Sequence, residues 1–445
     1  MGAFAYVRKR LTAFRMIILG FAAIILMGAV LLMLPFSSAA GNTTPFTDAL
    51  FTSTSAVCVT GLVVHDTAAY WSVFGQSVIL VLIQIGGMGV VTVAASMIVI
   101  SGRKISLLQR TAMQEAVAAP KIKGIVRMNL FIIKMIFVTE LAGALLMFPV
   151  FCRDFGPAKG VWMAVFHSVS AFCNAGFDLM GTQSRFSSLT NYAYNPVINI
   201  VIMALIVAGG LGFVTWEDVR RNRLRFYRYI LQSKVILTIT AVLILLPAVY
   251  LYFFEFGSAG SGDRVWLSLF QSVTTRTAGF NTADLTSVSG AGIVLIIALM
   301  LTGGSPGSTA GGMKTTNIAV LFSTAVTVFR RGEDVNFFGR RLSDQVIRNA
   351  VTLLLMYLVL FLCGGMIISR VEGLGLMECL FETASAIGTV GLSLGITGDL
   401  GSISRMILIF LMFFGRVGGI TVIYAAVSRP QRNVKKLPLG DITVG

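Results

Sequence analysis

Charged side chains are scarce in this chain, and it contains only two histidines. Charged residues make up 12% of the 445 positions, hydrophobic residues make up 56%, and the mean hydropathy is +0.85. Soluble domains carry far more charge, so the composition predicts a polytopic membrane protein. His65 and His167 are accompanied by no HExxH or paired-acid motif, which argues against a membrane enzyme.

Cysteine is also sparse, and the spacing of the five cysteines fits no metal site. We expect Cys58 and Cys173 to be small, polarizable packing residues, with a redox or metal role as the alternative. The sequence has no nucleotide-binding fingerprint and no stretch long enough for a soluble regulatory domain. It therefore predicts no covalently bound cofactor, and regulation must come from another chain.

Basic residues outnumber acidic ones, 35 against 19, and 25 of them lie in five short segments. These are Arg8, Lys9, Arg10 and Arg15; Arg103, Lys104, Arg110, Lys121, Lys123 and Arg127; Arg220, Arg221, Arg223, Arg225, Arg228 and Lys234; Arg330, Arg331, Arg340, Arg341 and Arg348; and Arg429, Arg432, Lys435 and Lys436. By the positive-inside rule, the five segments and both termini are predicted to be cytoplasmic. The distribution argues against nucleic-acid binding, with anionic-lipid or partner contacts as a secondary use.

Between these basic segments the chain must cross the membrane and return, which predicts eight spans in four pairs. Outgoing spans are expected over residues 12–35, 128–151, 230–254 and 348–370, and returning spans over 73–100, 195–215, 289–328 and 402–428. Each is long enough for a hydrocarbon core of ~30 Å. The first apolar run, residues 11–34, is too long for the core of a signal peptide. Within each pair a shorter segment fits a re-entrant helix on the extracellular side.

Each pair of spans encloses one copy of a short polar phrase that ends on glycine and a large apolar residue. The copies are FTSTSAVCVTGL (51–62), FHSVSAFCNAGF (166–177), FQSVTTRTAGF (270–280) and FETASAIGTVGL (381–392), the third being one residue shorter. Polar loops cannot face lipid, so four in register predict a water-filled path. We therefore predict an all-α membrane protein with four parallel helix–pore helix–loop–helix repeats around one pseudo-fourfold pore. The predicted repeats are residues 1–105, 106–222, 223–340 and 341–428, followed by a cytoplasmic tail, 429–445.

The chemistry of these phrases favours a monovalent cation. A pore helix that points its carboxyl end at the axis presents partial negative charge, and the loop after it offers carbonyl oxygens. Glycine at the end of each loop permits close backbone approach. Apart from Glu382 the phrases contain no acidic residue, so the site suits potassium better than Ca²⁺ or Mg²⁺.

The phrases VCVTGL, CNAGF, TRTAGF and IGTVGL, in this order and spacing, resemble those of the Trk/Ktr/HKT superfamily of cation transporters. Over essentially its whole length the chain looks most like the KtrB-type membrane subunits of bacterial Ktr potassium uptake systems. The resemblance implies a potassium-selective filter, because Gly61 stands where some sodium-preferring plant relatives have serine. The implied filter residues are Val57, Cys58, Val59, Thr60 and Gly61; Phe172, Cys173, Asn174, Ala175 and Gly176; Thr275, Arg276, Thr277, Ala278 and Gly279; and Ile387, Gly388, Thr389, Val390 and Gly391.

Two departures limit what the filter is expected to do. The short third phrase shifts the register of its carbonyl groups, and no phrase has the TVGYG sequence of tetrameric potassium channels. We therefore expect one or two well-formed potassium sites at the filter backbone, with weaker discrimination against sodium.

The third returning segment is interrupted by GGSPGSTAGGMKTT, which cannot form a regular helix in lipid. The alternatives from the residues are a broken-helix hinge and a flexible obstruction under the filter. The resemblance implies an intramembrane gating loop, in which Lys314 places a positive charge on the ion path. The implied gate residues are Gly303, Gly304, Ser305, Pro306, Gly307, Ser308, Thr309, Ala310, Gly311, Gly312, Met313, Lys314, Thr315 and Thr316.

Several charged residues lie within apolar or filter segments, where an unpaired charge is energetically costly. The resemblance implies that Arg416 shapes the ion barrier below the filter; the alternatives are snorkelling or a pair with Glu140 or Glu382. Glu140 is expected to be structural, and Arg276 to point away from the ions. Asp178 either enriches cations at the mouth or is an ordinary loop residue.

The predicted function is potassium uptake across the plasma membrane through a gated, channel-like pore, with sodium as an activator. A sodium- or proton-coupled potassium symporter is the alternative, whereas a structural scaffold does not account for the four polar loops. The resemblance implies a homodimer on a cytoplasmic ring of nucleotide-binding RCK-type subunits. The basic loops and residues 429–445 are the expected docking surfaces.

Overall fold

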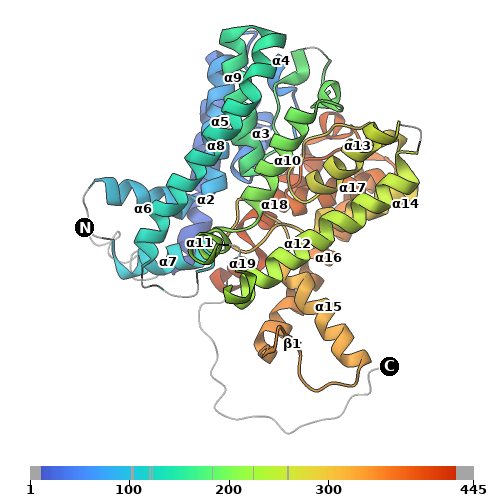
Figure 1. The fold of residues 1–445 in the computed structure, drawn as a ribbon. Helices are drawn as coiled ribbons and strands as arrows, with labels where there is room; N and C mark the ends of the chain where they lie inside the picture. Colours follow the sequence, from blue (N-terminus) through green and yellow to red (C-terminus); the bar gives the residue numbers. More distant parts are fainter. Residues whose placement is uncertain are drawn as a thin grey trace.

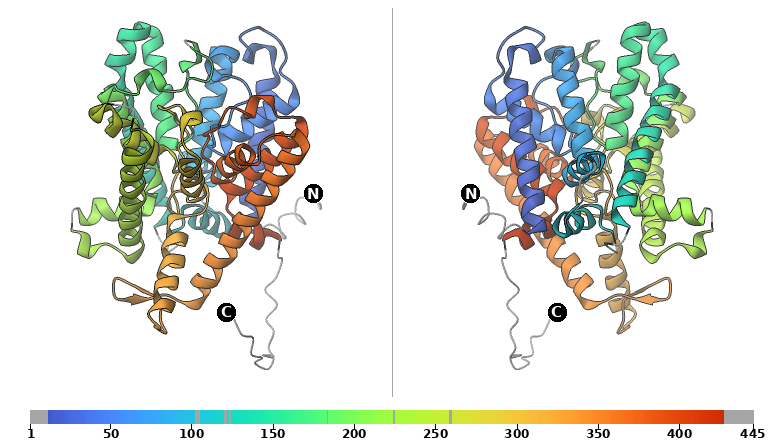
Figure 2. Two further views of the ribbon diagram at one scale, coloured as in Figure 1. Left: turned by 90° about the vertical axis from the view of Figure 1, so that its right-hand side faces the viewer. Right: turned by 90° about the vertical axis from the view of Figure 1, so that its left-hand side faces the viewer.

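The computed structural model describes residues 12–101, 105–119, 122, 124–182, 184–223, 225–257 and 260–426, and this part of the chain is almost entirely helical (Figure 1). Its one sheet is a small antiparallel hairpin of β1 (Asn336–Phe337) and β2 (Arg340–Arg341). The hairpin lies between α15 and α16 and projects from the helical body (Figure 2). The predicted all-α class is confirmed.

Four long apolar helices match the predicted outgoing spans, and their ends differ from the predicted ends by only a few residues. They are α2 (Ala13–Met33), α8 (Ile125–Phe155), α12 (Leu231–Tyr250, continued by a π-helical turn, Leu251–Glu255) and α16 (Asp344–Glu372). Each is long and apolar enough to cross a membrane. Their ends are set by ordinary signals, such as the Thr12 side chain that accepts a hydrogen bond from the Arg15 N–H.

A helix too short to span follows each outgoing helix and ends inside one of the four phrases. These pore helices are α3 (Phe46–Val57), α9 (Pro157–Cys173), α13 (Ser261–Thr274) and α17 (Leu376–Gly388). Asp48, Asp263 and Glu378 lie in the first turns of three of them, where negative charge is favourable.

The returning spans are bent or interrupted, although the sequence predicted an interruption only in the third. Three bend by 91° to 99° after a glycine: α5 (Val73–Met88) into α6 (Val90–Ile100), α10 (Pro196–Gly210) into α11 (Phe213–Asn222), and α18 (Ser402–Val417) into α19 (Gly419–Ala426). The glycines at the bends, Gly89, Gly212 and Gly418, have φ of 83°, 86° and 90°, a region open mainly to glycine. The third return consists of α14 (Gly290–Leu301) and α15 (Thr315–Phe329), separated by an irregular segment.

The repeats pack in chain order around a closed ring. Each returning helix contacts the pore helix of the next repeat: α5 packs on α9, α10 on α13, α14 on α17, and α18 on α3. The last contact joins the fourth repeat to the first, and Figure 2 shows their red and blue helices side by side. Connecting elements are η1 (Pro35–Ser37), α4 (Thr67–Tyr70), α7 (Leu107–Val117), η2 (Met180–Thr182), η3 (Thr190–Tyr192), η4 (Phe226–Arg228), η6 (Leu285–Ser287) and η7 (Thr397–Asp399).

Candidate functional site

The four glycines that end the phrases form a ring. A β-carbon added to Gly61 would collide with the carbonyl oxygen of Ala175, and the same relation links the other glycines to the carbonyl of the following repeat. The remaining pairs are Gly176 with Ala278, Gly279 with Val390, and Gly391 with Thr60. All four glycines have positive φ, between 68° and 94°. Each repeat therefore fits its carbonyl against the bare Cα of its neighbour, and only glycine leaves room for it.

A second repeated feature turns the chain out of each pore helix. The residue two positions before each ring glycine adopts a left-handed conformation. These residues are Val59 (φ 58°), Asn174 (59°), Thr277 (80°) and Thr389 (52°). Asparagine tolerates this region, but β-branched residues are strained in it. Strain at three equivalent positions indicates that the surrounding ring holds the backbone in place.

The hydroxyl groups of the phrases hold the backbone. Ser55 and Ser385 accept hydrogen bonds from the N–H groups of Gly61 (3.1 Å) and Gly391 (3.0 Å). At the matching positions of the other repeats the hydroxyl groups donate to the carbonyl after the glycine; they are Ser170 to Phe177 (2.7 Å) and Thr274 to Phe280 (2.6 Å). The polar side chains that distinguish the phrases in the sequence thus serve largely to hold the backbone in place.

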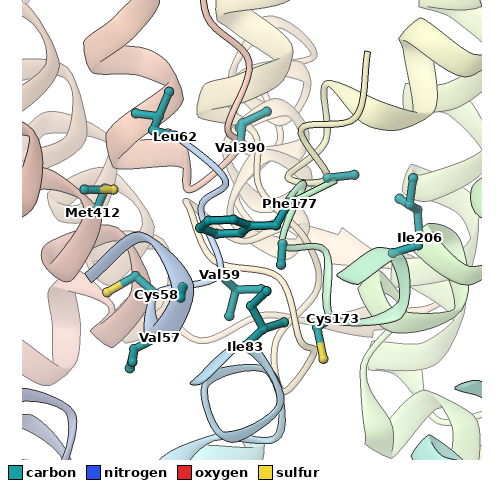
Figure 3. Close-up of a cluster of buried hydrophobic side chains, with 14 of the residues drawn as sticks. Val57, Cys58, Val59, Leu62, Ile83, Cys173, Phe177, Ile206, Val390 and Met412 are labelled. Atoms are coloured by element: carbon teal, nitrogen blue, oxygen red, sulfur yellow. The ribbon is translucent and has the colours of Figure 1, made fainter. Parts of the chain in front are cut away.

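A second hydroxyl in each phrase fastens the pore helix to the outgoing helix of its own repeat. Each donates to a backbone carbonyl: Ser53 to Ile25 (2.7 Å), Ser168 to Glu140 (2.5 Å), Ser272 to Ile244 (2.6 Å) and Thr383 to Phe361 (3.2 Å). Large apolar side chains such as Met412 and Ile206 surround the phrase residues Val57, Cys58, Val59 and Cys173 (Figure 3). Both cysteines are free and fully buried, as packing residues would be.

On one side of the ring lies a vestibule, a cavity of about 260 Å³ lined by the four ring glycines and by Asp66, Asp178 and Asp399. Asp66 accepts hydrogen bonds from the N–H groups of Ala68 and Phe186, so it ties the loops of the first two repeats together. Burial, together with the nearby charge of Asp66, raises the pKa of Asp178 to about 6. The vestibule is thus lined by three carboxyl groups, and the pKa of Asp178 leaves this residue mostly ionised at pH 7.

On the other side of the ring, the segment 303–316 crosses beneath the phrases; it is irregular up to Lys314, and its last two residues begin α15. Thr309 donates through its hydroxyl to the carbonyl of Phe172 (3.1 Å) and through its N–H to that of Gly209 (3.2 Å). Gly312 N–H donates to the carbonyl of Gly415 (3.2 Å), and Gly311 packs directly against Thr389. The segment is thus bonded to the second and fourth repeats while it belongs to the third.

Arg416, near the end of α18, fixes this segment from the fourth repeat. Its guanidinium donates to the carbonyls of Thr309 and Gly86, and to that of Gly87 at 3.3 Å. It bonds to backbone oxygens, so the alternatives of a pair with Glu140 or Glu382 are not what the structure shows. Those carboxyl groups face Gln84 and Cys173 in one case, and Ser393 and Thr397 in the other.

Two further cations lie close to the ring. Lys314 donates to the carbonyls of Ala310 (2.9 Å) and Gly311 (3.3 Å) within its own segment. Arg276 is 8% exposed and lines a separate cavity of about 10 Å³ with Asn174 and Gly304, not the vestibule.

Comparison with known proteins gives a consistent result. The family model TrkH, described as a cation transport protein, matches residues 8–437. The potassium/sodium uptake protein NtpJ of Enterococcus hirae is 39% identical over 435 residues, which cover 96% of this chain and 95% of that protein. The Ktr system potassium uptake protein B of Bacillus subtilis is 36% identical over 444 residues, covering 98% and 97%. The crystal structure of the potassium transporter TrkH from Vibrio parahaemolyticus has the same fold, with a TM-score of 0.73 and 20% identity over 92% of this chain and 83% of that one.

Proposed function

This chain belongs to the TrkH family of cation transport proteins, and we propose that it takes up potassium ions across the cell membrane through a gated, channel-like pore. The observation that carries the proposal is the closed ring of four glycines, each fitted against a neighbouring backbone carbonyl. Neutral carbonyl oxygens can replace the hydration shell of a monovalent cation. The protein is a multi-pass membrane protein, and its proposed activity is transport without chemical conversion.

We assign the filter to residues 57–61, 172–176, 275–279 and 387–391, one set from each repeat, with potassium at the backbone. Most of these side chains are buried in the hydrophobic core or bonded to neighbouring groups, and Asp66, Asp178 and Asp399 line the vestibule beside the ring. This arrangement supports selection by the backbone, with the vestibule concentrating cations.

We assign the gate to residues 303–316, held closed by Arg416. The segment passes directly beneath Thr389, and its bonds to two neighbouring repeats, with those of Arg416, fix it across the pathway. Lys314 adds a positive charge that opposes cations until the segment moves. The other returning helices bend at one glycine, whereas here a long irregular segment separates α14 from α15, which supports a gate over a simple hinge.

A channel-like pathway is favoured over a coupled symporter. Glu140 and Glu382 are bonded to protein groups behind the phrases, so neither is free to take up a coupled ion or proton on the path. Sodium remains our proposed activator, in keeping with the potassium/sodium uptake protein among the relatives.

The proposed assembly is a homodimer with one pore per subunit on a cytoplasmic nucleotide-binding ring of RCK type. The name of the Ktr system relatives supports a membrane subunit that works with other components. Both termini are assigned to the cytoplasm; residues 1–11 and the proposed docking tail, 429–445, lie outside the described residues.

The test replaces Gly61 with serine and measures potassium and sodium uptake in cells that lack their own potassium transporters. A β-carbon at Gly61 meets the Ala175 carbonyl, so Gly61→Ser should displace an oxygen of the second repeat. We expect potassium uptake to fall by about tenfold or more and the share of sodium to rise. Gly41→Ser is the matched control, because Gly41 also has positive φ (72°) but open space around it. Unchanged selectivity in Gly61→Ser would remove the filter assignment.

A further inference from the structure

The four seams between repeats allow a residue-by-residue comparison within one chain. The hydrogen bond from each pore helix to its outgoing helix marks equivalent positions on the four outgoing helices. The residues at these positions are Ile25, Glu140, Ile244 and Phe361. Three are apolar and one is acidic. Because the bond uses the backbone carbonyl, the architecture itself does not require an acid at Glu140.

Glu140 is 5% exposed and lies against two polar groups from different repeats. Its Oε2 accepts a hydrogen bond from Gln84 Nε2 of α5 at 3.2 Å, and its Oε1 lies 3.8 Å from the sulfur of Cys173. The Gln84 Oε1 is 4.0 Å from the same sulfur. These three residues form what we call the polar seam. It joins the returning helix of the first repeat, the outgoing helix of the second, and the second phrase.

The partner of Glu140 is also exceptional. Gln84 lies two positions before Gly86, and the residues two positions before the corresponding glycines, Gly209 and Gly415, are Val207 and Phe413. An acid within a membrane-spanning helix is energetically costly, and acids that occur there commonly serve a function. No cationic side chain lies within 4 Å of the Glu140 carboxyl group in the described part of the chain. An ion pair within those residues therefore does not explain it.

The polar seam contacts the turn of the second phrase. Cys173 directly precedes Asn174, the left-handed residue of the second phrase, and its sulfur fills the space in front of Gly87. Gly87 and Gly86 offer the carbonyls that Arg416 binds. A change in the polar seam is therefore transmitted to the second phrase and to the contact that holds the segment beneath it.

We propose that Glu140 is a positioning residue for ion selection: through Gln84 and Cys173 it sets the place of the second filter phrase, and so the fit of the ring to potassium. This inference rests on the proposed filter. Hydrogen bonds depend on direction as well as distance, so the contacts of the Glu140 carboxyl group restrict the positions of Gln84 and Cys173 more narrowly than non-directional apolar contacts would. The polar seam adds this restraint to the second phrase, in which asparagine occupies the left-handed position that β-branched residues occupy in the other phrases.

The experiment compares Glu140→Ile, Glu140→Gln and Gln84→Val in potassium uptake, scoring KM, Vmax and competition by sodium. Isoleucine at this position should fold, because Ile25 and Ile244 occupy the same place in two other repeats. For Glu140→Ile and Gln84→Val we expect the KM for potassium to rise by about tenfold with Vmax within twofold, and sodium to compete better. Glu140→Gln keeps an acceptor for Gln84 and should restore most of the affinity. Ile244→Val is the control and should behave as the unmodified protein.

Each outcome is decisive. An unchanged KM and sodium competition in Gln84→Val and Glu140→Ile would overturn the proposal and leave the polar seam a packing feature. If Glu140→Ile does not reach the membrane, Gln84→Val decides by the same criterion, since Val207 shows that the place accepts valine. If Gly61→Ser alters selectivity while these variants do not, this inference fails and the filter stands. If Gly61→Ser has no effect, the filter assignment itself has failed.

Discussion

Individual residues in the four phrases have different structural roles, although the sequences of the phrases are alike. The serines and threonines bond to backbone groups, whereas the ring glycines have no side chain to clash with the neighbouring carbonyl. The sequence predicted the glycines as points of close backbone approach, because each phrase ends on one. It did not predict the left-handed Val59 and Thr389, because β-branched residues rarely adopt that conformation without tertiary support.

Arg416 is expected to hold the segment 303–316 in place, so weakening it should release the segment. Arg416→Lys replaces a planar fork, which reaches the carbonyls of Thr309 and Gly86 together, by a single ammonium group. Loss of one charge-assisted hydrogen bond, about 2 kcal/mol, predicts an increase in basal ion flux of at least about tenfold. Rubidium tracer flux into proteoliposomes of the purified protein measures this. Arg370→Lys, at an exposed arginine, should not change the flux, and an equal or lower flux in Arg416→Lys would contradict the assignment.

Asp178 should make potassium affinity depend on external pH. Its pKa is raised to about 6 by burial and by Asp66, so the vestibule loses a negative charge as the pH falls from 7 to 5. We expect the KM for potassium to rise a few-fold over that interval, and Asp178→Asn to have a high KM at every pH. Because its folded-state pKa lies above the unfolded value, this group contributes most to stability at low pH. The loss of affinity should therefore occur without unfolding, which a thermal melt at each pH checks.

Helices that return to the cytoplasm carry the main difference between sequence and structure. Their apolar length predicted single spans, and length alone cannot distinguish a straight helix from two that meet at about 90°. The missed signal is a repeated glycine pattern, IGGMG (85–89), AGGLG (208–212) and GRVGG (415–419). Its first glycine packs on a phrase carbonyl, and the glycine three positions later breaks the helix.

Adjacent glycines in α10 separate these roles. A β-carbon at Gly209 would collide with the carbonyl oxygen of Phe172, whereas one at Gly210 would make an ordinary contact of 3.5 Å with Asn174 Nδ2. We therefore expect Gly209→Ala to lower potassium uptake by about tenfold or more, and Gly210→Ala to change it by less than about twofold. Uptake at matched surface expression measures both. Equal effects of the two substitutions would show that close packing on the phrase is not what Gly209 provides.

The assembled ring must close between its last repeat and its first, and this contact could not be predicted from local patterns. The sequence predicted four repeats, because polar phrases and basic segments recur. The partners across the closing seam are 357 positions apart in the chain: Arg405 and Asp48 form an ion pair of 2.6 Å. Arg405 also donates to the carbonyl of Gly398, and Asp48 Oδ2 lies 2.9 Å from His65 Nε2. Only the folded chain brings these groups together.

The closing ion pair should stabilise the whole molecule more than an exposed pair does. Its side chains are 17% and 11% exposed, against 66% and 47% for the pair of Arg341 and Asp334. Breaking a largely buried pair leaves an uncompensated charge and costs about 3 kcal/mol, whereas an exposed pair contributes less than about 1 kcal/mol. Arg405→Gln should therefore lower the melting temperature of the purified protein clearly, and Arg341→Gln should not.

Arg405→Gln and Arg341→Gln also test whether closing the ring affects ion selection. If the pair acts by closing the ring, Arg405→Gln should widen the vestibule side of the first and fourth phrases and weaken potassium selectivity in proportion to the lost stability. Asp48→Asn should have the same effect, because it removes the partner of both Arg405 and His65. A melting temperature equal to that of Arg341→Gln would mean that the helix contacts of α18 and α3 close the ring without the ion pair.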